Sequence, residues 1–502
     1  RWTNGSWSGD PSISTQEDYR FGFYESRAES WDRLAYNSPY YLMVISAGNH
    51  RGDSGDGSFP VDGPYDIIAG AKNGKNILTV GAVGKISNGY NDPTDIVMSS
   101  FSSWGPTDDG RIKPDLVGAG VNLFSVYSGS DDAYASISGT SMATPNVVGT
   151  LVLLQELNKK LYGSFLKSSA LKGLAIHTAH EAGRADGPDY EHGWGLMNAV
   201  GASELIIGKN GSDRIIDNHV LASGETFSLP INPTEGSTVK VTICWTDLPG
   251  TPTTPQLDPQ DLMLVNDLDL RVTGTDETYM PYILDPSRPV EAATTGDNFR
   301  DNVEKIEFTA TGQPYDLVVS HKGDLQTGQQ EFSLIVSYES EGSDVYYWIG
   351  EKDGDWSNTN NWSQTSGGSA SGSIPGIEDK VVFDNNSFDE IDGSNSNESV
   401  EFILNEDIEV ASLLALSEQI TINLNNHDLT IGGSLSASFG EVNFSGDGNI
   451  ILKEGNSLAN SINGNPDTFK DVNVIVDYAN ESVLSIKGDM NFKKLYVKNG
   501  TV

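Results

Sequence analysis

The chain has one cysteine, few basic residues and no long apolar run. These shortages argue in turn against a disulfide within the chain, a transmembrane helix and a nucleic-acid partner. Because Cys244 is alone, no disulfide can form within the chain, although many secreted proteins also lack disulfides. No apolar stretch reaches the roughly 18 residues of a transmembrane helix. Only 31 lysines and arginines face 70 aspartates and glutamates, a formal net charge of -39. Nucleic acid is therefore excluded as the default partner, because no basic stripe exists to neutralise phosphates.

The acidic excess suits solubility, high salt or calcium binding by carboxylates. At 502 residues the chain is long enough for two to four domains. It begins at Arg1 rather than methionine, and residues 1–20 do not resemble a signal peptide. We therefore expect an N-terminally truncated chain.

The first region, residues 1–205, has the pattern of an α/β domain. The short apolar runs 41–48 and 76–83 are typical of buried parallel strands. Between 147 and 180 the apolar spacing is helical. These features predict a parallel sheet covered by helices.

Two β-rich regions follow the α/β region. Residues 206–340 alternate with period two, clearly so at 239–245 and 317–320, which predicts an antiparallel sandwich or jelly roll. Residues 341–502 have short strands between polar turns, which predicts a further β-rich module, either a solenoid or a second sandwich. Its clearest strands are 420–424, 429–431 and 442–444.

One serine stands at the start of a long apolar helix. Ser141 lies in the segment 139–145, Gly-Thr-Ser-Met-Ala-Thr-Pro, which runs into the apolar segment 147–154. We expect Pro145 in the first helical turn, where its missing N–H costs nothing. A hydroxyl at a helix N-terminus faces free N–H groups and the positive end of the dipole, which suits a nucleophile that creates an oxyanion. The alternative is a serine that merely caps a buried helix.

The segment around this serine resembles the Ser box of the subtilisin-like serine proteases (subtilases, peptidase family S8) at all seven positions. It is not the Gly-x-Ser-x-Gly elbow of α/β-hydrolases, because Ala143 replaces the second glycine. Segments 101–106 and 110–115 resemble the family's Ser-Ser-Arg-Gly-Pro and Lys-Pro-Asp, with Trp104 for the usual arginine; alone, Lys-Pro-Asp is an ordinary turn. The resemblance implies a serine endopeptidase, with residues 1–205 as the C-terminal part of its catalytic domain.

Acyl transfer by serine also needs oxyanion donors and contacts to the substrate. Asn49 follows Ser46-Ala47-Gly48, which resembles the family's Asn after Ala-Ala-Gly. The resemblance implies that its amide shares the oxyanion with the Ser141 N–H, and that Ser46, Ala47 and Gly48 contact substrate. The alternative for Asn49 is a residue that only tolerates a left-handed turn.

A second segment resembles the part of the family that forms one wall of the P1 pocket. Ser6 and Trp7 stand in Ser-Trp-Ser-Gly, similar to the family's Ser-x-Gly, although Ser8 replaces a glycine. An extended peptide paired there would bind by β-augmentation. The alternative is a surface loop. The family implies protein or peptide substrates and no organic cofactor.

The general base and its acidic partner do not have candidates with the family's pattern. The family order Asp, His, Asn, Ser puts both before Asn49, yet residues 1–48 contain no histidine, and His50 would lie on the oxyanion loop. Three aspartates lie there, Asp10, Asp18 and Asp32, but none is in an apolar strand followed by glycine, as the family's aspartate is. We expect both groups to lie upstream of this sequence, which makes the chain alone inactive. The alternative is a non-catalytic surface or adhesion protein with an inactive protease domain.

Acidic segments of the second region predict a calcium site. Segments 244–247, 264–270 and 296–304 resemble the jelly-roll domain of bacterial alkaline subtilases, so the resemblance extends to about residue 340. Those relatives bind calcium, which prefers carboxylate and carbonyl oxygens. The predicted ligands are Asp267, Asp269, Asp297 and Asp301. The alternative is a set of acids that solvate a strand edge.

The start of the third region, residues 347–363, resembles bacterial surface-protein modules with a role in display or adhesion. Trp356 and Trp362 either stack on sugars or fill the core of this module. With the protease resemblance, this implies a secreted or cell-surface bacterial protein.

Overall fold

The computed structural model divides the chain into two compact units, which are described separately. Unit 1 comprises Arg1–Gln155, Leu166–Ser203 and Ile216–Tyr338, and unit 2 comprises Glu156–Phe165, Glu204–Ile215 and Glu339–Val502. The structure describes residues 17–52, 63–87, 89–209, 213–338, 344–350, 354–377, 379–384, 386–387, 400–415, 420–432, 435–436, 443–453, 460–463, 466–478, 484–487 and 490–499. The two domain boundaries expected from the sequence, after residues 205 and 340, stay predictions.

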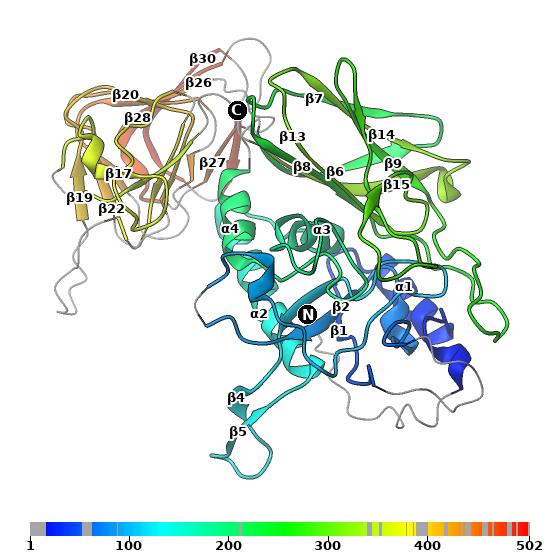
Figure 1. Cartoon of the computed structure of the whole chain (residues 1–502). Helices are drawn as coiled ribbons and strands as arrows, with labels where there is room; N and C mark the ends of the chain where they lie inside the picture. Colours follow the sequence, from blue (N-terminus) through cyan, green and yellow to red (C-terminus); the bar gives the residue numbers. More distant parts are fainter. Residues whose placement is uncertain are drawn as a thin grey trace. The chain divides into compact units, whose positions relative to one another are not determined.

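The part of unit 1 up to Ser203, here the α/β part, is built on a parallel sheet of order β1-β2-β3 (Figure 1). Its strands are β1 (Val44–Ser46), β2 (Leu78–Val83) and β3 (Leu116–Ala119). Nearly every residue in them is buried, as expected for a sheet covered on both faces. The prediction of a parallel α/β fold is therefore confirmed, with strands inside the apolar runs 41–48 and 76–83.

Among the described residues up to Gly208 there are four helices and three short 3-10 turns. They are η2 (Asp18–Arg20), α1 (Ser26–Tyr36), η3 (Gly70–Asn73), η4 (Pro93–Asp95), α2 (Thr140–Tyr162), α3 (Ser168–Thr178) and α4 (Ala199–Gly208). The expectation that Pro145 lies in the first helical turn was wrong, because α2 already begins at Thr140. Pro145 lacks the N–H that would bond the carbonyl of Ser141 four residues earlier. The Thr144 hydroxyl donates to the Thr140 carbonyl at 2.9 Å within this turn.

The rest of unit 1, Ile216–Tyr338, here the sandwich part, contains two four-stranded antiparallel sheets. Their orders are β10-β9-β14-β7 and β13-β8-β15-β6. The strands are β6 (Arg214–Ala222), β7 (Phe227–Ile231), β8 (Thr238–Cys244), β9 (Leu268–Thr273), β10 (Thr278–Tyr279), β13 (Val303–Thr309), β14 (Tyr315–His321) and β15 (Gln329–Ser337). Strands β11 (Tyr282–Ile283) and β12 (Thr294–Thr295) form a separate small pair, and η5 spans Gln326–Gly328. The strands expected at 239–245 and 317–320 are β8 and β14.

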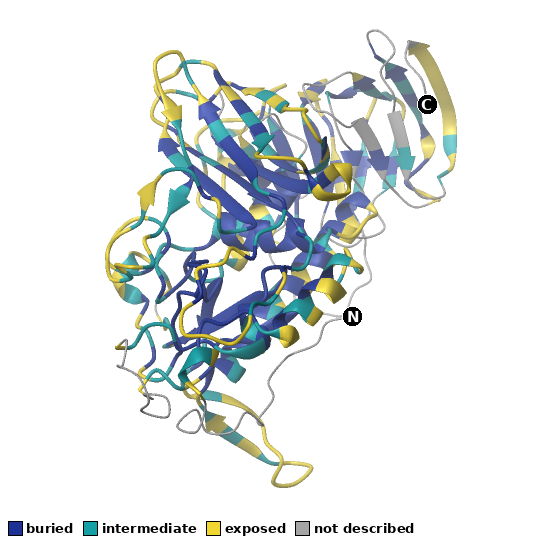
Figure 2. Cartoon of the chain, turned by 90° about the vertical axis from the view of Figure 1, so that its right-hand side faces the viewer, coloured by how far each residue is buried: buried dark blue, intermediate teal, exposed yellow. Residues whose placement is uncertain are grey.

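Helix α3 packs directly against the sandwich part and is buried along almost its whole length (Figure 2). A Cβ added to Gly173 would lie 2.7 Å from Ile335 Cδ1 and 3.0 Å from Cys244 Cβ. Only glycine therefore lets the helix approach the sheet this closely. Cys244, the single thiol, is buried in this contact.

His177 on α3 is hydrogen bonded into the same contact. Its Nδ1 lies 2.9 Å from Thr242 Oγ1, and its Nε2 lies 2.8 Å from Ser337 Oγ. Burial, together with Lys305 and Lys240, lowers the pKa of His177 well below its usual value. The folded protein therefore keeps this ring neutral.

We expect the free energy of unfolding of His177→Gln to fall less steeply with decreasing pH than that of wild type. Below pH about 6.5 the unfolded chain binds a proton at this histidine and the folded chain does not, so stability is full above that pH and falls as pH falls. The slope from one such group approaches about 1.4 kcal/mol per pH unit. Urea unfolding at several pH values checks this, with His427→Gln in unit 2 as control. Identical slopes for wild type and His177→Gln would contradict it.

A two-stranded hairpin of unit 1 extends away from the sheet (Figure 1). It consists of β4 (Leu123–Val126) and β5 (Tyr134–Ile137). The rings of Phe124 and Tyr134 stack across it at 5.4 Å and are exposed.

The described residues of unit 2 form three sheets, in which almost all neighbouring strands are parallel. Their orders are β17-β16-β18-β21-β24-β27-β29, β19-β22-β25 and β20-β23-β26-β28-β30. The elements are β16 (Val345–Trp348), η6 (Thr359–Asn361), β17 (Trp362–Ser363), β18 (Lys380–Phe383), β19 (Val400–Ile403), β20 (Ile408–Val410), β21 (Ser412–Ala415), β22 (Ile420–Asn423), β23 (Leu429–Ile431), β24 (Leu435–Ser436), β25 (Asn443–Ser445), β26 (Asn449–Lys453), β27 (Asn460–Asn463), β28 (Phe469–Asp477), β29 (Leu484–Lys487) and β30 (Phe492–Asn499).

Equivalent side chains of unit 2 stack on one another from strand to strand. In one column each residue is the partner of the next: Ile408, Leu429, Ile450, Val474 and Leu495. The rings of Phe444, Phe469 and Phe492 form a second column, with 5.5 Å between successive centroids. Trp356 and Trp362 are buried, 4.5 Å apart, so they belong to the core of this unit.

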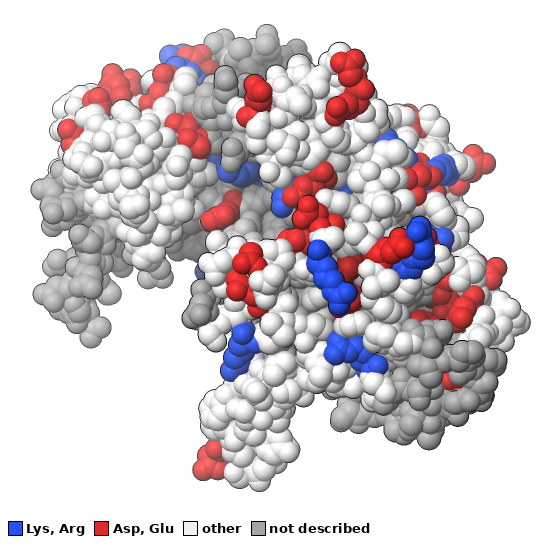
Figure 3. All heavy atoms as spheres, viewed as in Figure 1, with Lys and Arg blue, Asp and Glu red and all other residues white. Residues whose placement is uncertain are grey.

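On the face drawn in Figure 3, basic side chains lie singly or in small groups beside acidic ones. None of the helices among the described residues combines the length and apolarity that crossing a membrane requires.

Candidate active site

Ser141 lies in the first turn of α2 and is half-buried. The Gly139 N–H donates to the Gly120 carbonyl at 2.9 Å, which fixes the start of the helix beside the end of β3. The Gly139 carbonyl accepts from the N–H groups of Met142 at 2.9 Å and Ala143 at 3.3 Å. The Ser141 N–H belongs to the first turn, whose amides have no acceptor within the helix. A developing negative charge beside Ser141 would meet that amide and the positive end of the dipole.

Asn49 joins the end of β1 to the start of α2. Its Oδ1 accepts from the Thr140 N–H at 2.8 Å and from the Thr140 hydroxyl at 2.9 Å. Because a backbone N–H can only donate, the bonded atom is the oxygen, and the two N–H donors of Nδ2 point elsewhere. A Cβ added to Gly139 would lie 3.5 Å from Asn49 Nδ2 and 3.7 Å from the Ser141 nitrogen. The two predicted donors therefore both lie close to Gly139.

The alternative reading of Asn49, as a residue that tolerates a left-handed turn, does not hold. The positive φ in this segment belongs to Gly48, at 123°, and not to Asn49. The Gly48 N–H donates to the Thr140 hydroxyl at 3.2 Å. The orientation of Asn49 thus comes from its bonds to Thr140.

Of the other residues predicted to contact substrate, Ser46, Ala47 and Gly48 are described by the structure. Ser46 and Ala47 are buried at the end of β1, which is an outer strand of the described three-stranded sheet. Gly48 accepts at its carbonyl from the Ser103 N–H at 2.9 Å. Ser6 and Trp7 lie outside the described residues, as does Asp10.

Two of the aspartates that precede Asn49 lie among the described residues, Asp18 and Asp32. Asp18 lies in η2 and is half-buried. Asp32 on α1 is fully buried and accepts from the Tyr24 hydroxyl at 2.8 Å and from the N–H groups of Lys75 and Asn76. Burial and Asp32 together raise the pKa of the Tyr24 hydroxyl. Asp32 therefore serves as an acceptor for three buried donors.

Six of the histidines have partners in other parts of the structure. Their contacts are His177 with Thr242 and Ser337, His180 with the ring of Tyr90, His192 with Asp189, His219 with the ring of Phe227, His321 with the Gly224 N–H, and His427 with Asp407. The seventh, His50, uses its backbone N–H to donate to Ser103 Oγ at 3.3 Å.

The Lys-Pro-Asp segment, an ordinary turn when read from sequence, is a buried ion cluster. Asp115 pairs with Lys113, and its Oδ1 lies 2.9 Å from Lys172 Nζ. Its Oδ2 accepts from the Thr79 N–H at 2.7 Å. The side chains of Lys113, Asp115 and Lys172 are all buried. The sequence signal that could have found it is a lysine and an aspartate directly before the apolar strand β3.

Three of the four predicted calcium ligands gather around an ammonium group. Lys322 Nζ lies 3.1 Å from Asp267, 2.9 Å from Asp269 and 2.8 Å from Asp297. Asp301 lies apart from them and accepts from the Ile112 N–H at 2.9 Å. In this arrangement the three carboxylates are paired with the ammonium group of Lys322. Calcium binding at these residues stays a prediction.

A serine hydroxyl at a helix N-terminus, beside a side-chain amide at the end of a parallel strand, is the kind of arrangement used by serine hydrolases. Residues 2–195 match the family model described as "Subtilase family". This part of the chain is therefore similar to the subtilase (peptidase S8) family of serine proteases.

Curated relatives match shorter stretches. The chain is 33% identical over 131 residues to the C5a peptidase of Streptococcus pyogenes serotype M3, covering 24% of this chain and 11% of that protein. It is 32% identical over 132 residues to the serine protease AprX of Bacillus subtilis, covering 24% of this chain and 27% of that protein. The matches thus span only a small share of these relatives.

Solved structures give a weaker likeness. The self-cleaved protease domain of PatA is 23% identical with a TM-score of 0.29, covering 38% of this chain and 58% of that one. The prenylagaramide maturation protease PagA is 21% identical with a TM-score of 0.30, covering 39% of this chain and 61% of that one.

Proposed function

We propose that this chain carries the nucleophile and the oxyanion hole of a subtilase endopeptidase that hydrolyses protein or peptide substrates. Ser141 Oγ would attack the scissile carbonyl, and Asn49 Nδ2 with the Ser141 N–H would stabilise the resulting oxyanion. The observation that carries this proposal is the fixed orientation of Asn49. Its oxygen is held by Thr140, so its amide donors are presented without reorganisation.

The base and the acid of the triad are proposed to come from residues that this sequence does not contain. The family's order of Asp, His, Asn and Ser supports this, as do the other partners of six histidines. The isolated chain would then hydrolyse no peptide bonds. The second candidate is a non-catalytic surface or adhesion protein that keeps the fold; it has no use for an oriented Asn49 amide.

We further propose that the sandwich part is a jelly roll and that unit 2 is a β-solenoid. Two antiparallel sheets of four strands support the first, and the columns of equivalent side chains support the second. The resemblance of residues 347–363 to surface modules supports a secreted or cell-surface location.

Imidazole in the buffer tests this function, because it can act as a general base from solution. We expect imidazole-dependent hydrolysis of an activated peptide ester that is abolished in Ser141→Ala. Asn49→Asp should lower that rate by about 10²–10³-fold, a magnitude known from a subtilisin and so borrowed from this family. The measurement is the initial rate of ester hydrolysis as a function of imidazole concentration.

The two variants of Asn49 separate catalysis from folding. Asn49→Asp keeps an acceptor for both Thr140 donors, so its stability should match wild type, whereas Asn49→Ala loses the cap and about 0.5–2 kcal/mol. Equal rates for wild type and Ser141→Ala would rule out the nucleophile. Ser141-dependent cleavage of peptides without imidazole would show that a histidine of this chain already serves as base.

A further inference from the structure

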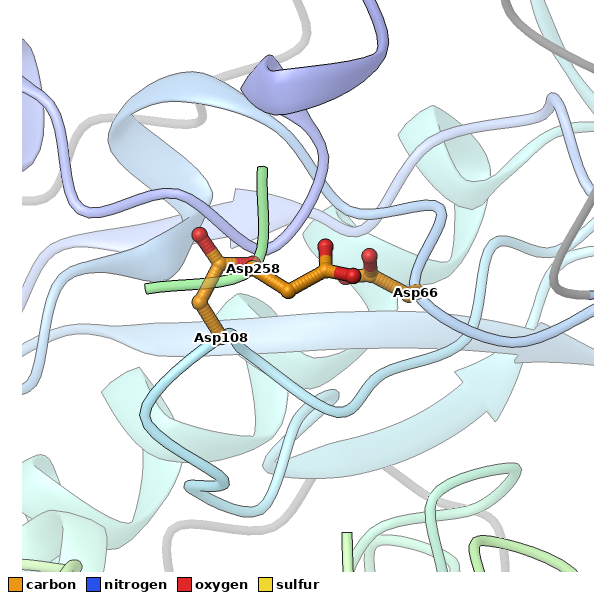
Figure 4. A group of neighbouring side chains, drawn as sticks. All are labelled: Asp66, Asp108 and Asp258. Atoms are coloured by element: carbon orange, nitrogen blue, oxygen red, sulfur yellow. The ribbon is translucent and has the colours of Figure 1, made fainter. Parts of the chain in front are cut away.

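Three aspartates that are far apart in sequence meet in unit 1. Asp66 and Asp108 belong to loops of the α/β part, and Asp258 belongs to the loop that joins β8 to β9 (Figure 4). One carboxylate oxygen from each lies within 4.8 Å of the other two. Like charges this close destabilise the fold unless a cation or a proton offsets them.

Asp108 is the buried member of the three, and its carboxylate has no hydrogen-bond donor in the described part of the chain. Asp108 is only 7% exposed, and among the residues that the structure describes neither of its carboxylate oxygens has a hydrogen-bond partner. The nearby Arg111 is paired with Asp109, at 2.8 Å between Nε and Oδ2. A buried carboxylate without partners costs several kcal/mol or a proton, which is rare in a native fold.

The backbone holds this carboxylate in place from both sides. The Asp108 N–H donates to the Gly22 carbonyl at 3.2 Å, and the Asp108 carbonyl accepts from Gln260 Nε2 at 2.9 Å. Gln260 also binds the Asp258 carbonyl at 3.2 Å, which ties the loop carrying the third aspartate to the same place. The carboxylates are therefore gathered by the fold.

Gly22 leaves open the space that these oxygens face. A Cβ there would lie 2.1 Å from Asp108 Oδ1 and 2.4 Å from Asp66 Oδ1. Its φ of 67° is also one that residues with a side chain rarely adopt. The bare Cα thus lets two carboxylates converge.

We propose that Asp66, Asp108 and Asp258 bind a calcium ion that fastens the β8–β9 loop of the sandwich part to the α/β part. Calcium–oxygen distances of about 2.3–2.6 Å allow two ligand oxygens to lie up to about 5.2 Å apart, which includes the whole observed spread. Magnesium–oxygen distances of about 2.0–2.1 Å allow at most about 4.2 Å. The remaining ligands of a six- to eight-fold shell would be carbonyls and water.

Thermal unfolding of the full chain tests the site, first in chelator and then in about 1 mM CaCl₂, a range in which extracellular calcium modules are occupied. We expect Ca²⁺ to raise the melting temperature of wild type. In Asp108→Asn the rise should vanish, and in Asp258→Asn, an exposed loop position, the affinity should fall about tenfold or more. Asp131→Asn, at an exposed turn outside both aspartate clusters, is the control and should respond like wild type.

The direction in which Asp108→Asn changes the melting temperature in chelator distinguishes an ion site from an aspartate that only supports the fold. Without calcium, Asp108→Asn should melt no lower than wild type, because it removes a buried charge that has no partner. Three results would overturn the proposal: no calcium response in wild type, an unchanged response in both Asp108→Asn and Asp258→Asn, or an equal response to Mg²⁺. If Asp108→Asn fails to fold, Asp258→Asn alone decides.

Discussion

Asp115→Asn is expected to lower the free energy of unfolding of unit 1 by about 3–5 kcal/mol. The asparagine keeps the shape of the side chain but removes the charge that serves both Lys113 and Lys172. Two buried ammonium groups would then have no counter-charge. Burial by itself would raise the pKa of Asp115, but the two lysines hold it below its usual value, so the substitution removes a charge that is present at neutral pH.

Chemical denaturation of the full chain measures this loss. Asp131→Asn, at an exposed turn between β4 and β5, is the control and should stay within about 0.5 kcal/mol of wild type. Adding Lys113→Met to Asp115→Asn should recover part of the stability, because one uncompensated charge is removed. A loss below about 1 kcal/mol would contradict the charge-pairing explanation.

Lys75→Met is expected to cost a similar amount, about 3–5 kcal/mol, at the contact between the α/β part and the sandwich part. The side chains of Lys75 and Asp247 are fully buried and pair with each other. Lys75 Nζ also donates to the Leu248 carbonyl at 2.7 Å. Methionine fills the same volume but leaves the Asp247 carboxylate buried without a cation.

The pH dependence of this stability loss, together with a double variant, tests whether the unpaired Asp247 carboxylate causes it. Burial already raises the pKa of Asp247, so in Lys75→Met this carboxyl should take up a proton as pH falls, and the loss should shrink from pH about 7 to about 5. Lys75→Met combined with Asp247→Asn should be more stable than Lys75→Met alone at neutral pH. If the two substitutions simply add, the pair does not act as a unit.

Local patterns made much of the fold predictable. The apolar runs 41–48 and 76–83 contain β1 and β2, because a buried parallel strand must be apolar on both faces. The helix that contains Ser141 could also be predicted, because the serine and the start of the helix belong to one contiguous sequence motif. Asn49 could be proposed from its position after a strand, although the bonds to Thr140 that orient it join residues 91 positions apart.

The parts that could not be predicted depend on contacts between distant segments. The Lys75–Asp247 pair spans 172 positions, and its members look like ordinary surface charges in sequence. The same holds for Asp66, Asp108 and Asp258, whose meeting depends on how loops pack. Pro145 was misplaced for a different reason, since the helix begins before the residue that usually marks a helix start.

The buried Lys75–Asp247 pair also limits how such chains can recombine. An exchange that replaced Ile216–Tyr338 alone would bring in a new sandwich without the partner of Lys75, and each hybrid would inherit an orphaned charge. An exchange beyond Tyr338 separates neither member of the pair. In evolution and in engineering alike, the two parts of unit 1 should therefore be exchanged together, whereas an exchange that begins after Tyr338 leaves this pair intact.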